Sequence, residues 1–177
     1  MSRTLGVVLA AGGGERYGMP KVAAAKGAWL GSAVSALADG GVSRVLVALG
    51  AVVVPIPSPA TPLLVPDWRR GLSATVAAAV RAARADDAIE TLVLHTVDTP
   101  GIGSAVVERV LGVDSGLARA VYRGRPGHPV VIKRDYWNRL SRSLSGDVGA
   151  GPFVESRTEL VRVECSDLAS GVDIDEK

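Results

Sequence analysis

The chain has 177 residues, of which 47% are hydrophobic and 21% charged. This is enough for one ordinary domain with a sizeable core and too little for two. The 20 basic and 18 acidic residues give a formal charge of +2, and the basic residues are scattered, which argues against nucleic acid as the main partner. The single cysteine, Cys165, excludes an internal disulfide and fits a reducing compartment. We therefore expect a single domain over residues 1–177, located in the cytoplasm.

Strand-like and helix-like segments alternate along the chain. The predicted strands are Leu5–Ala10, Arg44–Leu49, Leu63–Val65, Thr91–Thr96, Ala118–Tyr122, Pro129–Lys133 and Leu160–Glu164. The predicted helices are Leu30–Ala38, Leu72–Arg84, Ser104–Leu111 and Asp135–Leu144. This order predicts right-handed βαβ units, and hence an α/β fold with a mostly parallel sheet.

Two apolar stretches imitate membrane-directed segments. Leu5–Ala11 follows a basic residue like the core of a signal peptide, but it runs directly into a glycine-rich loop, as a buried strand does. Val45–Pro66 has no charged residue over a length that could cross a bilayer. It contains five prolines, each of which removes a helix hydrogen-bond donor. We expect a strand, a proline-rich connection and a second strand there, and no association with a membrane.

The first strand opens into a glycine-rich loop, Gly12–Pro20. Glycines permit positive φ and let backbone N–H groups approach an anion. The loop fails the dinucleotide fingerprint because Tyr17 replaces the third glycine, and it fails the Walker A pattern because Met19 replaces the lysine. A flexible turn is the plain alternative. Arg16 and Lys21 in the same segment favour an anion site.

A second loop, Pro66–Ser73, follows the third predicted strand and so lies at the same sheet edge. Gly71 and Ser73 could offer hydrogen bonds to a base or a ribose, or Ser73 could simply cap the next helix. Trp68 could be a lid over the site or part of the core.

A carboxylate follows the fourth predicted strand. Ligands of open α/β sheets bind at the carboxyl edge where the strand order reverses, so Asp98 would face the glycine loop if the first and fourth strands are neighbours there. A carboxylate beside a polyphosphate needs a cation between them, usually Mg²⁺. The alternatives are that Asp98 caps the helix that begins near Ser104 or forms a turn before Pro100.

Two later segments carry further polar candidates. His128, in a Gly-His-Pro segment, could contact an anionic substrate, or it could be structural. Asp173, in the Asp-Ile-Asp segment close to the end of the chain, could be a second metal ligand, or it could belong to a solvated tail.

Taken in order, these segments resemble the MobA-like nucleotidyltransferases, and most closely the branch that makes molybdopterin cytosine dinucleotide. The opening motif of that family, roughly L-A-A-G-x-G-x-R-x-G-x-x-K, is matched by Leu9, Ala10, Ala11, Gly12, Gly14, Arg16, Gly18 and Lys21. Later family segments are matched by Pro66, Trp68, Gly71, Ser73, Asp98, Pro100, Gly127–Pro129, Gly146-Asp147, Gly149-Ala150 and Asp173–Asp175.

The resemblance implies a Rossmann-like three-layer sandwich and Mg²⁺-dependent transfer of CMP from CTP to the phosphate of molybdopterin, with release of pyrophosphate. It implies catalytic roles for Lys21 and Arg16 and metal binding by Asp98 and Asp173, and a molybdenum enzyme could receive the product. His128 would touch the substrate. The nucleotide would be bound by Leu9, Ala10, Ala11, Gly12, Gly13, Gly14, Lys21, Gly71 and Ser73.

Two other functions stay open at this point. One is a transferase of the same fold that uses GTP or another nucleotide, with molybdopterin or a sugar phosphate as acceptor. The other is a non-catalytic protein that binds a nucleotide or cofactor. The chain departs from the family pattern at Thr99, where glutamine is frequent, and at Gly151, where arginine is usual. It also carries the proline-rich stretch where relatives place a helix.

Overall fold

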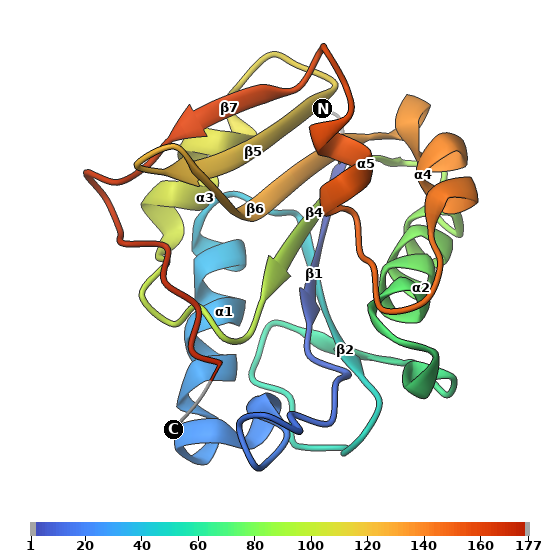
Figure 1. Cartoon of the computed structure of the whole chain (residues 1–177), viewed down its shortest axis with the longest axis vertical. Helices are drawn as coiled ribbons and strands as arrows, with labels where there is room; N and C mark the ends of the chain where they lie inside the picture. The colour runs from blue at the N-terminus through green and yellow to red at the C-terminus, as the bar shows by residue number, and fades with distance from the viewer. Residues whose placement is uncertain (1–2, 176–177) are drawn as a thin grey trace.

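A computed structural model describes residues 3–175 and contains one seven-stranded sheet (Figure 1). Its strands are β1 (Arg3–Leu9), β2 (Arg44–Leu49), β3 (Thr61–Leu64), β4 (Ile89–Thr96), β5 (Leu117–Tyr122), β6 (Arg125–Lys133) and β7 (Val161–Glu164). Their order across the sheet is β3-β2-β1-β4-β6-β5-β7. Only β6 runs antiparallel to its neighbours, β4 and β5. The predicted α/β fold with a mostly parallel sheet is confirmed.

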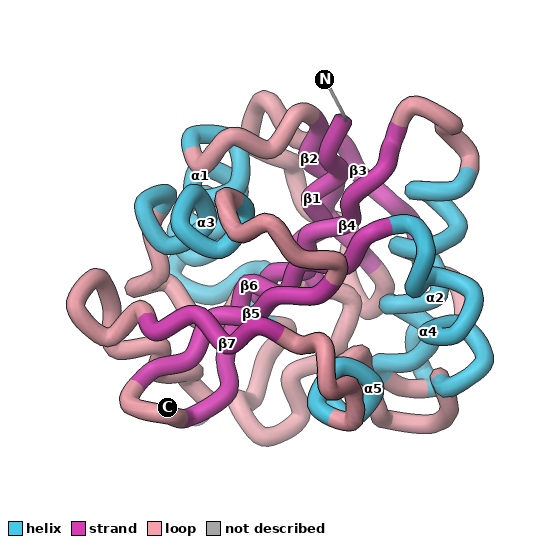
Figure 2. The backbone as a smooth tube through the Cα atoms, turned by 90° about the horizontal axis from the view of Figure 1, so that it is seen from above, coloured by secondary structure: helices cyan, strands magenta, loops and turns pink. Residues whose placement is uncertain are grey.

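Helices cover both faces of the sheet and make three layers, which Figure 2 shows from above. One face carries α1 (Ala28–Asp39) and α3 (Ser104–Leu111), and the other carries α2 (Leu72–Arg84), α4 (Trp137–Ser143) and α5 (Gly151–Glu155). Alternate residues of each strand point to opposite faces. In β4, Leu92 and Leu94 join the core beneath α2, whereas Val93 joins the core beneath α1. Small and β-branched side chains fill both cores, as a tightly packed central sheet requires.

The β5–β6 hairpin is longer than the sequence predicts. Tyr122 pairs with Arg125 across a turn in which Arg123 and Gly124 both have positive φ, 51° and 76°. Two successive residues in this conformation match the twist of adjacent strands, so the ladder starts at Arg125 rather than at Pro129. Sequence reasoning also missed three short helices, the 3₁₀ helices η1 (Lys21–Gly27) and η2 (Trp68–Arg70) and the helix α5.

The proline-rich segment connects two strands without a helix. No regular element occurs in residues 50–60, and Val52, Val54 and Ile56 pack against the core on the α1 face. No helix within residues 3–175 has both the length and the apolar character needed to cross a bilayer. The predicted strand, proline-rich connection and second strand of Val45–Pro66 are confirmed as β2, residues 50–60 and β3.

The strand order reverses beside β1. The chain runs outward from β1 to β2 and β3, and then returns to place β4 on the other side of β1. These four strands are parallel, so the loops that follow β1, β3 and β4 emerge at one edge of the sheet. This topology brings together the glycine-rich loop, the Trp68 loop and Asp98.

Candidate active site

A cleft of about 890 Å³ opens at the carboxyl edge of the parallel strands. Its wall is formed by Leu9–Tyr17 and Lys21 after β1, by Trp68–Leu72 after β3, and by Thr96–Asp98 after β4. Of the predicted nucleotide-binding residues, Leu9, Ala10, Ala11, Gly12, Gly13, Gly14, Lys21 and Gly71 all line it. The topology therefore collects residues from three separate loops into one site.

The glycine-rich loop folds back on itself at Gly14. This residue has a φ of +65°, and a Cβ there would overlap the carbonyl group of Met19. The Gly14 carbonyl accepts a hydrogen bond from the Gly18 N–H at 2.8 Å. Only glycine fits such a turn, and the turn returns the chain toward the sheet so that Lys21 reaches the cleft.

Lys21 joins two carboxylates in the centre of the site. Its Nζ lies 2.9 Å from Asp98 Oδ2 and 2.9 Å from Asp175 Oδ1. Burial alone would lower the pKa of Lys21, but the bonds to Asp175 and Asp98 outweigh it and raise that pKa above its usual value. The same lysine lowers the pKa of Asp175. Arg16 lies 3.8 Å from Asp175 with a side chain that is 77% exposed, so it stays at the mouth of the cleft.

The C-terminal segment carries two carboxylates to Asp98. Gly171, at a φ of +69°, lies so close to the Tyr122 ring that a Cβ would overlap it. Beyond it, the N–H of Ile174 donates to the Asp98 carbonyl at 3.0 Å. Carboxylate oxygens of Asp98, Asp173 and Asp175 consequently lie within 4.8 Å of one another. Such a set of hard oxygen ligands suits a divalent cation such as Mg²⁺.

The alternative that Asp98 caps the helix beginning near Ser104 is wrong. Helix α3 starts after Gly103, and no side-chain hydrogen bond caps it. The Asp98 carboxylate is paired with Lys21 instead.

The opposite end of the cleft is built around the start of α2. Gly71 precedes the helix at a φ of +103°, and Ser73 makes no capping bond, so the prediction of a Ser73 cap is wrong. The cap comes from a distant loop: Asp147 Oδ1 accepts from the Leu72 N–H at 3.1 Å, and the Gly146 carbonyl accepts from the Ser73 N–H at 3.3 Å. Ser73 is buried and does not line the cleft.

Trp68 is part of the wall. Its ring is partly buried against the core on the α2 face, and Gly13 and Gly50 pack against it. Arg69 lies over the ring, with its guanidinium carbon 4.7 Å from the ring centroid. These contacts support the core interpretation of Trp68 rather than that of a lid.

His128 lies in β6 and does not line the cleft. Desolvation, followed by the charge of Arg119, lowers the pKa of His128 to about 4, so the imidazole is neutral at pH 7. Its carbonyl accepts from the Tyr122 hydroxyl at 2.7 Å, and Arg119 donates to the neighbouring carbonyl of Gly127 at 3.0 Å. These bonds hold the Gly-His-Pro segment through its backbone.

Three further residues had no assigned site role in the sequence reasoning. Asp175 belongs to the Asp-Ile-Asp pattern, in which the sequence predicts only Asp173 as a metal ligand. Asp147 matches a motif of the family that the chain resembles, but no role is predicted for it. His95, in β4, is completely buried, and neither ring nitrogen has a partner among residues 3–175. Desolvation, followed by the charge of His128, lowers the pKa of His95 to about 3. Of these three residues, only Asp175 could have been identified as a site residue from the sequence, because it belongs to the Asp-Ile-Asp pattern.

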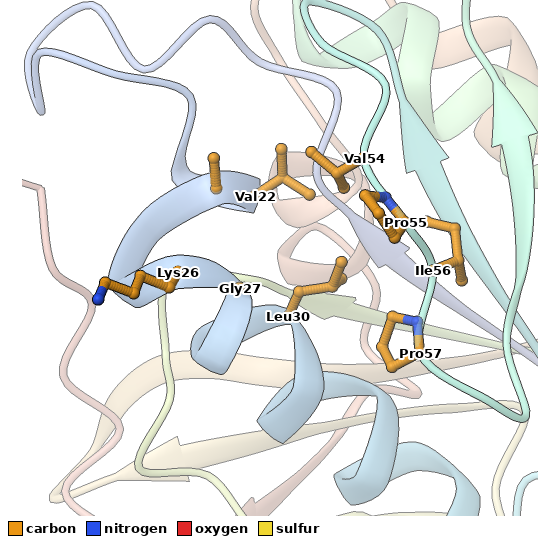
Figure 3. Close-up of a pocket in the computed structure, with 9 residues that line it drawn as sticks. Val22, Lys26, Gly27, Leu30, Val54, Pro55, Ile56 and Pro57 are labelled. Atoms are coloured by element: carbon orange, nitrogen blue, oxygen red, sulfur yellow. The ribbon is translucent and has the colours of Figure 1, made fainter.

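A second cavity of about 480 Å³ lies between η1, α1 and the proline-rich segment. Figure 3 shows its wall, where Val22 and Leu30 face the stretch Val54–Pro57, and the Lys26 ammonium points away from that stretch. Its lining is apolar apart from Lys26, so it has little to offer a triphosphate. The cleft that contains Lys21 and Asp98 is the better candidate.

Comparisons with known proteins identify the family of the chain. The protein named nicotine blue oxidoreductase, from Paenarthrobacter nicotinovorans, is 30% identical over 188 residues, which cover 96% of this chain and 91% of that protein. A crystal structure of the Mycobacterium tuberculosis Rv0371c homolog from Mycobacterium sp. strain JC1 is similar with a TM-score of 0.83 and 28% identity, over 99% of this chain and 91% of that one.

Rv0371c itself, from Mycobacterium tuberculosis H37Rv and in complex with manganese, shares the fold with a TM-score of 0.70 and 22% identity, over 97% of this chain and 94% of that one. The sequence profile of the MobA-like NTP transferase domain matches residues 6–162. The chain therefore belongs to the MobA-like NTP transferase family.

Proposed function

We propose that this protein is a cytoplasmic, Mg²⁺-dependent nucleotidyltransferase that moves CMP from CTP to the phosphate of molybdopterin and releases pyrophosphate. The proposal rests on one observation. The Lys21 Nζ, at the end of a glycine-rich loop, lies 2.9 Å from a carboxylate oxygen of Asp98 and 2.9 Å from one of Asp175. A lysine, a cluster of three carboxylates and a glycine-rich loop that lie close together are components that phosphoryl chemistry needs.

The glycine-rich loop would hold the triphosphate. The backbone from Ala11 to Gly14 lines the cleft and can present N–H groups to phosphate oxygens. Lys21 supplies a point charge, and the exposed Arg16 can close on the outer phosphates from the mouth. Both side chains are bound to Asp175 here, so nucleotide binding would exchange these ion pairs for phosphate contacts.

Asp98, Asp173 and Asp175 would hold the divalent cation. When bound, Mg²⁺ would neutralise charge on the phosphate oxygens and so stabilise the transition state. The manganese complex of Rv0371c, which shares the fold, supports the proposal of a divalent cation. Within this chain, the Ile174–Asp98 backbone bond holds the tail, which carries Asp173 and Asp175, against the loop after β4, which carries Asp98.

The chemistry needs no general base. An acceptor phosphate is already ionised near neutral pH, so catalysis depends on in-line positioning and on charge neutralisation. His128 is neutral, and its ring stands back from the cleft. We assign it at most an indirect contact with the acceptor, through the segment that it shares with Gly127 and Pro129.

The proposal also specifies the nucleotide, CTP, and the acceptor, molybdopterin. Ala10-Ala11 resembles the cytidylyl branch of the family, and the motifs in the second half of the chain resemble those of molybdopterin-using members. GTP, another nucleotide or a sugar phosphate are the competing substrates. A molybdenum enzyme is the expected recipient of the product.

The test is pyrophosphate release from each of the four nucleoside triphosphates, with Mg²⁺ or Mn²⁺, in the presence and absence of molybdopterin or a sugar phosphate. Release that requires CTP and molybdopterin together is the expected result. Release with another pair would keep the reaction type and change the substrates. Because one relative is named an oxidoreductase, NADH and NADPH oxidation should be measured in parallel, and oxidation without pyrophosphate release would overturn the proposal.

A further inference from the structure

The loop before α5 forms part of the cleft wall at the start of α2. Gly71 approaches this loop so closely that a Cβ would lie 2.5 Å from the Gly146 carbonyl oxygen. Asp147 Oδ1 accepts from Leu72 N–H, although the two residues are 75 positions apart in sequence. This contact fixes the Asp147 carboxylate at the cleft, which it lines.

The same contact indicates which end of the cleft would bind phosphate and which would bind the nucleoside. The N-terminus of a helix as long as α2, with 13 residues, attracts phosphate through its free N–H groups and its dipole. Here the Leu72 and Ser73 N–H groups are already bound, by a carboxylate and by a carbonyl. A fixed negative charge at this end disfavours phosphate. With the triphosphate at Lys21, we infer that the nucleoside lies in the part of the same cleft that Gly71, Leu72 and Asp147 line.

Asp147 keeps spare hydrogen-bonding capacity in that position. An ionised carboxylate only accepts hydrogen bonds and has about four acceptor positions, of which the Leu72 N–H uses one. No salt bridge joins Asp147 to another residue in the described range 3–175. The second oxygen is therefore available to a donor group on a ligand in the cleft.

We propose that Asp147 determines base specificity by accepting a hydrogen bond from the exocyclic amino group of cytosine. The inference rests on the proposed nucleotidyltransferase function. Cytosine presents the N4 amino donor where uracil presents the O4 acceptor. The carboxylate therefore attracts CTP and repels UTP, which has the same size and shape. This adds a criterion for the base at the end of the cleft that Trp68–Leu72 and Thr75 also line.

The sharpest test is Asp147→Asn. The asparagine oxygen can still accept from Leu72 N–H, while its NH₂ group replaces an acceptor with a donor. Binding of CTP and UTP is measured at equilibrium with Mg²⁺ and without an acceptor, so the identity of the acceptor does not matter. We expect the CTP-over-UTP preference of the wild type to fall by about tenfold to a hundredfold, with the melting temperature unchanged.

A matched control is Asp39→Asn, which removes the same charge at an exposed position in α1 and should leave the preference unaltered. If Asp147→Asn lowers the melting temperature, Asp147→Ser serves instead. It retains a hydroxyl acceptor for the helix and removes the carboxylate, and it should weaken CTP binding without weakening UTP binding.

The outcomes separate the two proposals. A wild type that binds no nucleoside triphosphate removes the proposed function, and this inference with it. A wild type that binds CTP and UTP equally, or that prefers GTP, overturns the role of Asp147 alone. The role is also overturned if Asp147→Asn keeps the wild-type preference. Equal losses for CTP and UTP that disappear with their 2′-deoxy forms would place the carboxylate on the ribose and likewise overturn it.

Discussion

The two ends of the cleft are held together by different forces. At one end, Lys21 forms ion pairs with Asp98 and Asp175, and the three residues come from three separate segments. At the other, backbone contacts between Gly71 and Gly146 and a single carboxylate cap fix the wall. Changes at the charged end should therefore alter chemistry and metal affinity, whereas changes at the capped end should alter the choice of base and the stability of the fold.

The largest effect is expected from Asp98→Asn. The change keeps the size of the side chain and removes the central carboxylate, so turnover should fall by about a thousandfold while the fold persists. Pyrophosphate release measures the loss, and circular dichroism checks the fold. Asp135→Asn, an exposed position outside the cleft, is the matched control. Activity within twofold of the wild type would remove Asp98 from the metal site.

A second prediction concerns the strand beneath the charged end. His95 has a folded-state pKa of about 3, whereas the unfolded chain restores its ordinary value of 6.5. The unfolded state thus gains a proton below pH 6.5 that the folded state does not, and stability falls as the pH drops. The loss should be about 1.4 kcal/mol per pH unit and reach roughly 3 kcal/mol by pH 4.

Urea unfolding between pH 7 and pH 4 measures this slope. His128, whose folded pKa is about 4, contributes in the same direction over the same range. His95→Leu removes one of the two groups, so its slope should be shallower by about one proton. An identical slope in the variant and the wild type would show that His95 is protonated in the folded protein.

Lys21→Met should have opposite effects on rate and on metal affinity. Loss of the ammonium group removes a charge from the triphosphate site and should slow turnover by about a hundredfold. The same ammonium group lies between two of the carboxylates, so its removal should tighten Mn²⁺ binding in the absence of nucleotide. Electron paramagnetic resonance of free Mn²⁺ measures this affinity. Lys26→Met is the control, and weaker Mn²⁺ binding in Lys21→Met would contradict the competition.

The smallest effect is expected at the capped end. Gly71→Ala places a Cβ against the Gly146 backbone at a φ of +103°, which should cost about 2 kcal/mol of stability. Gly101→Ala, where a Cβ meets open space, should cost much less. Thermal unfolding compares them. Equal stabilities would mean that the α2 cap is not a rigid contact.

The sequence predicted the features of the fold and the site that depend on local residue patterns. Alternating apolar segments located the strands, and the glycine spacing located the turn that returns Lys21 to the sheet. Asp98 was predicted to face that loop because both follow parallel strands, and the reversal beside β1 brings them together.

What the sequence could not predict depends on contacts between distant segments. The Asp147 cap is one such contact, since no local pattern at α2 reveals it. The position of Asp175 is another, because it depends on the docking of the tail against Tyr122 and Asp98. Helix α5 has only five residues and begins with glycine and proline, so its pattern resembles a turn. The extent of the domain, residues 1–177, remains a prediction.

The most direct test of the central claim is pyrophosphate release by the wild type with Mg²⁺, CTP and molybdopterin, compared with the same mixture containing EDTA and with Asp98→Asn. We predict release that requires the metal, the nucleotide and the acceptor together, and that is lost in the variant. Nucleotide binding without any release, under conditions where Asp98→Asn binds equally well, would contradict it and identify the protein as a nucleotide-binding relative without transferase activity.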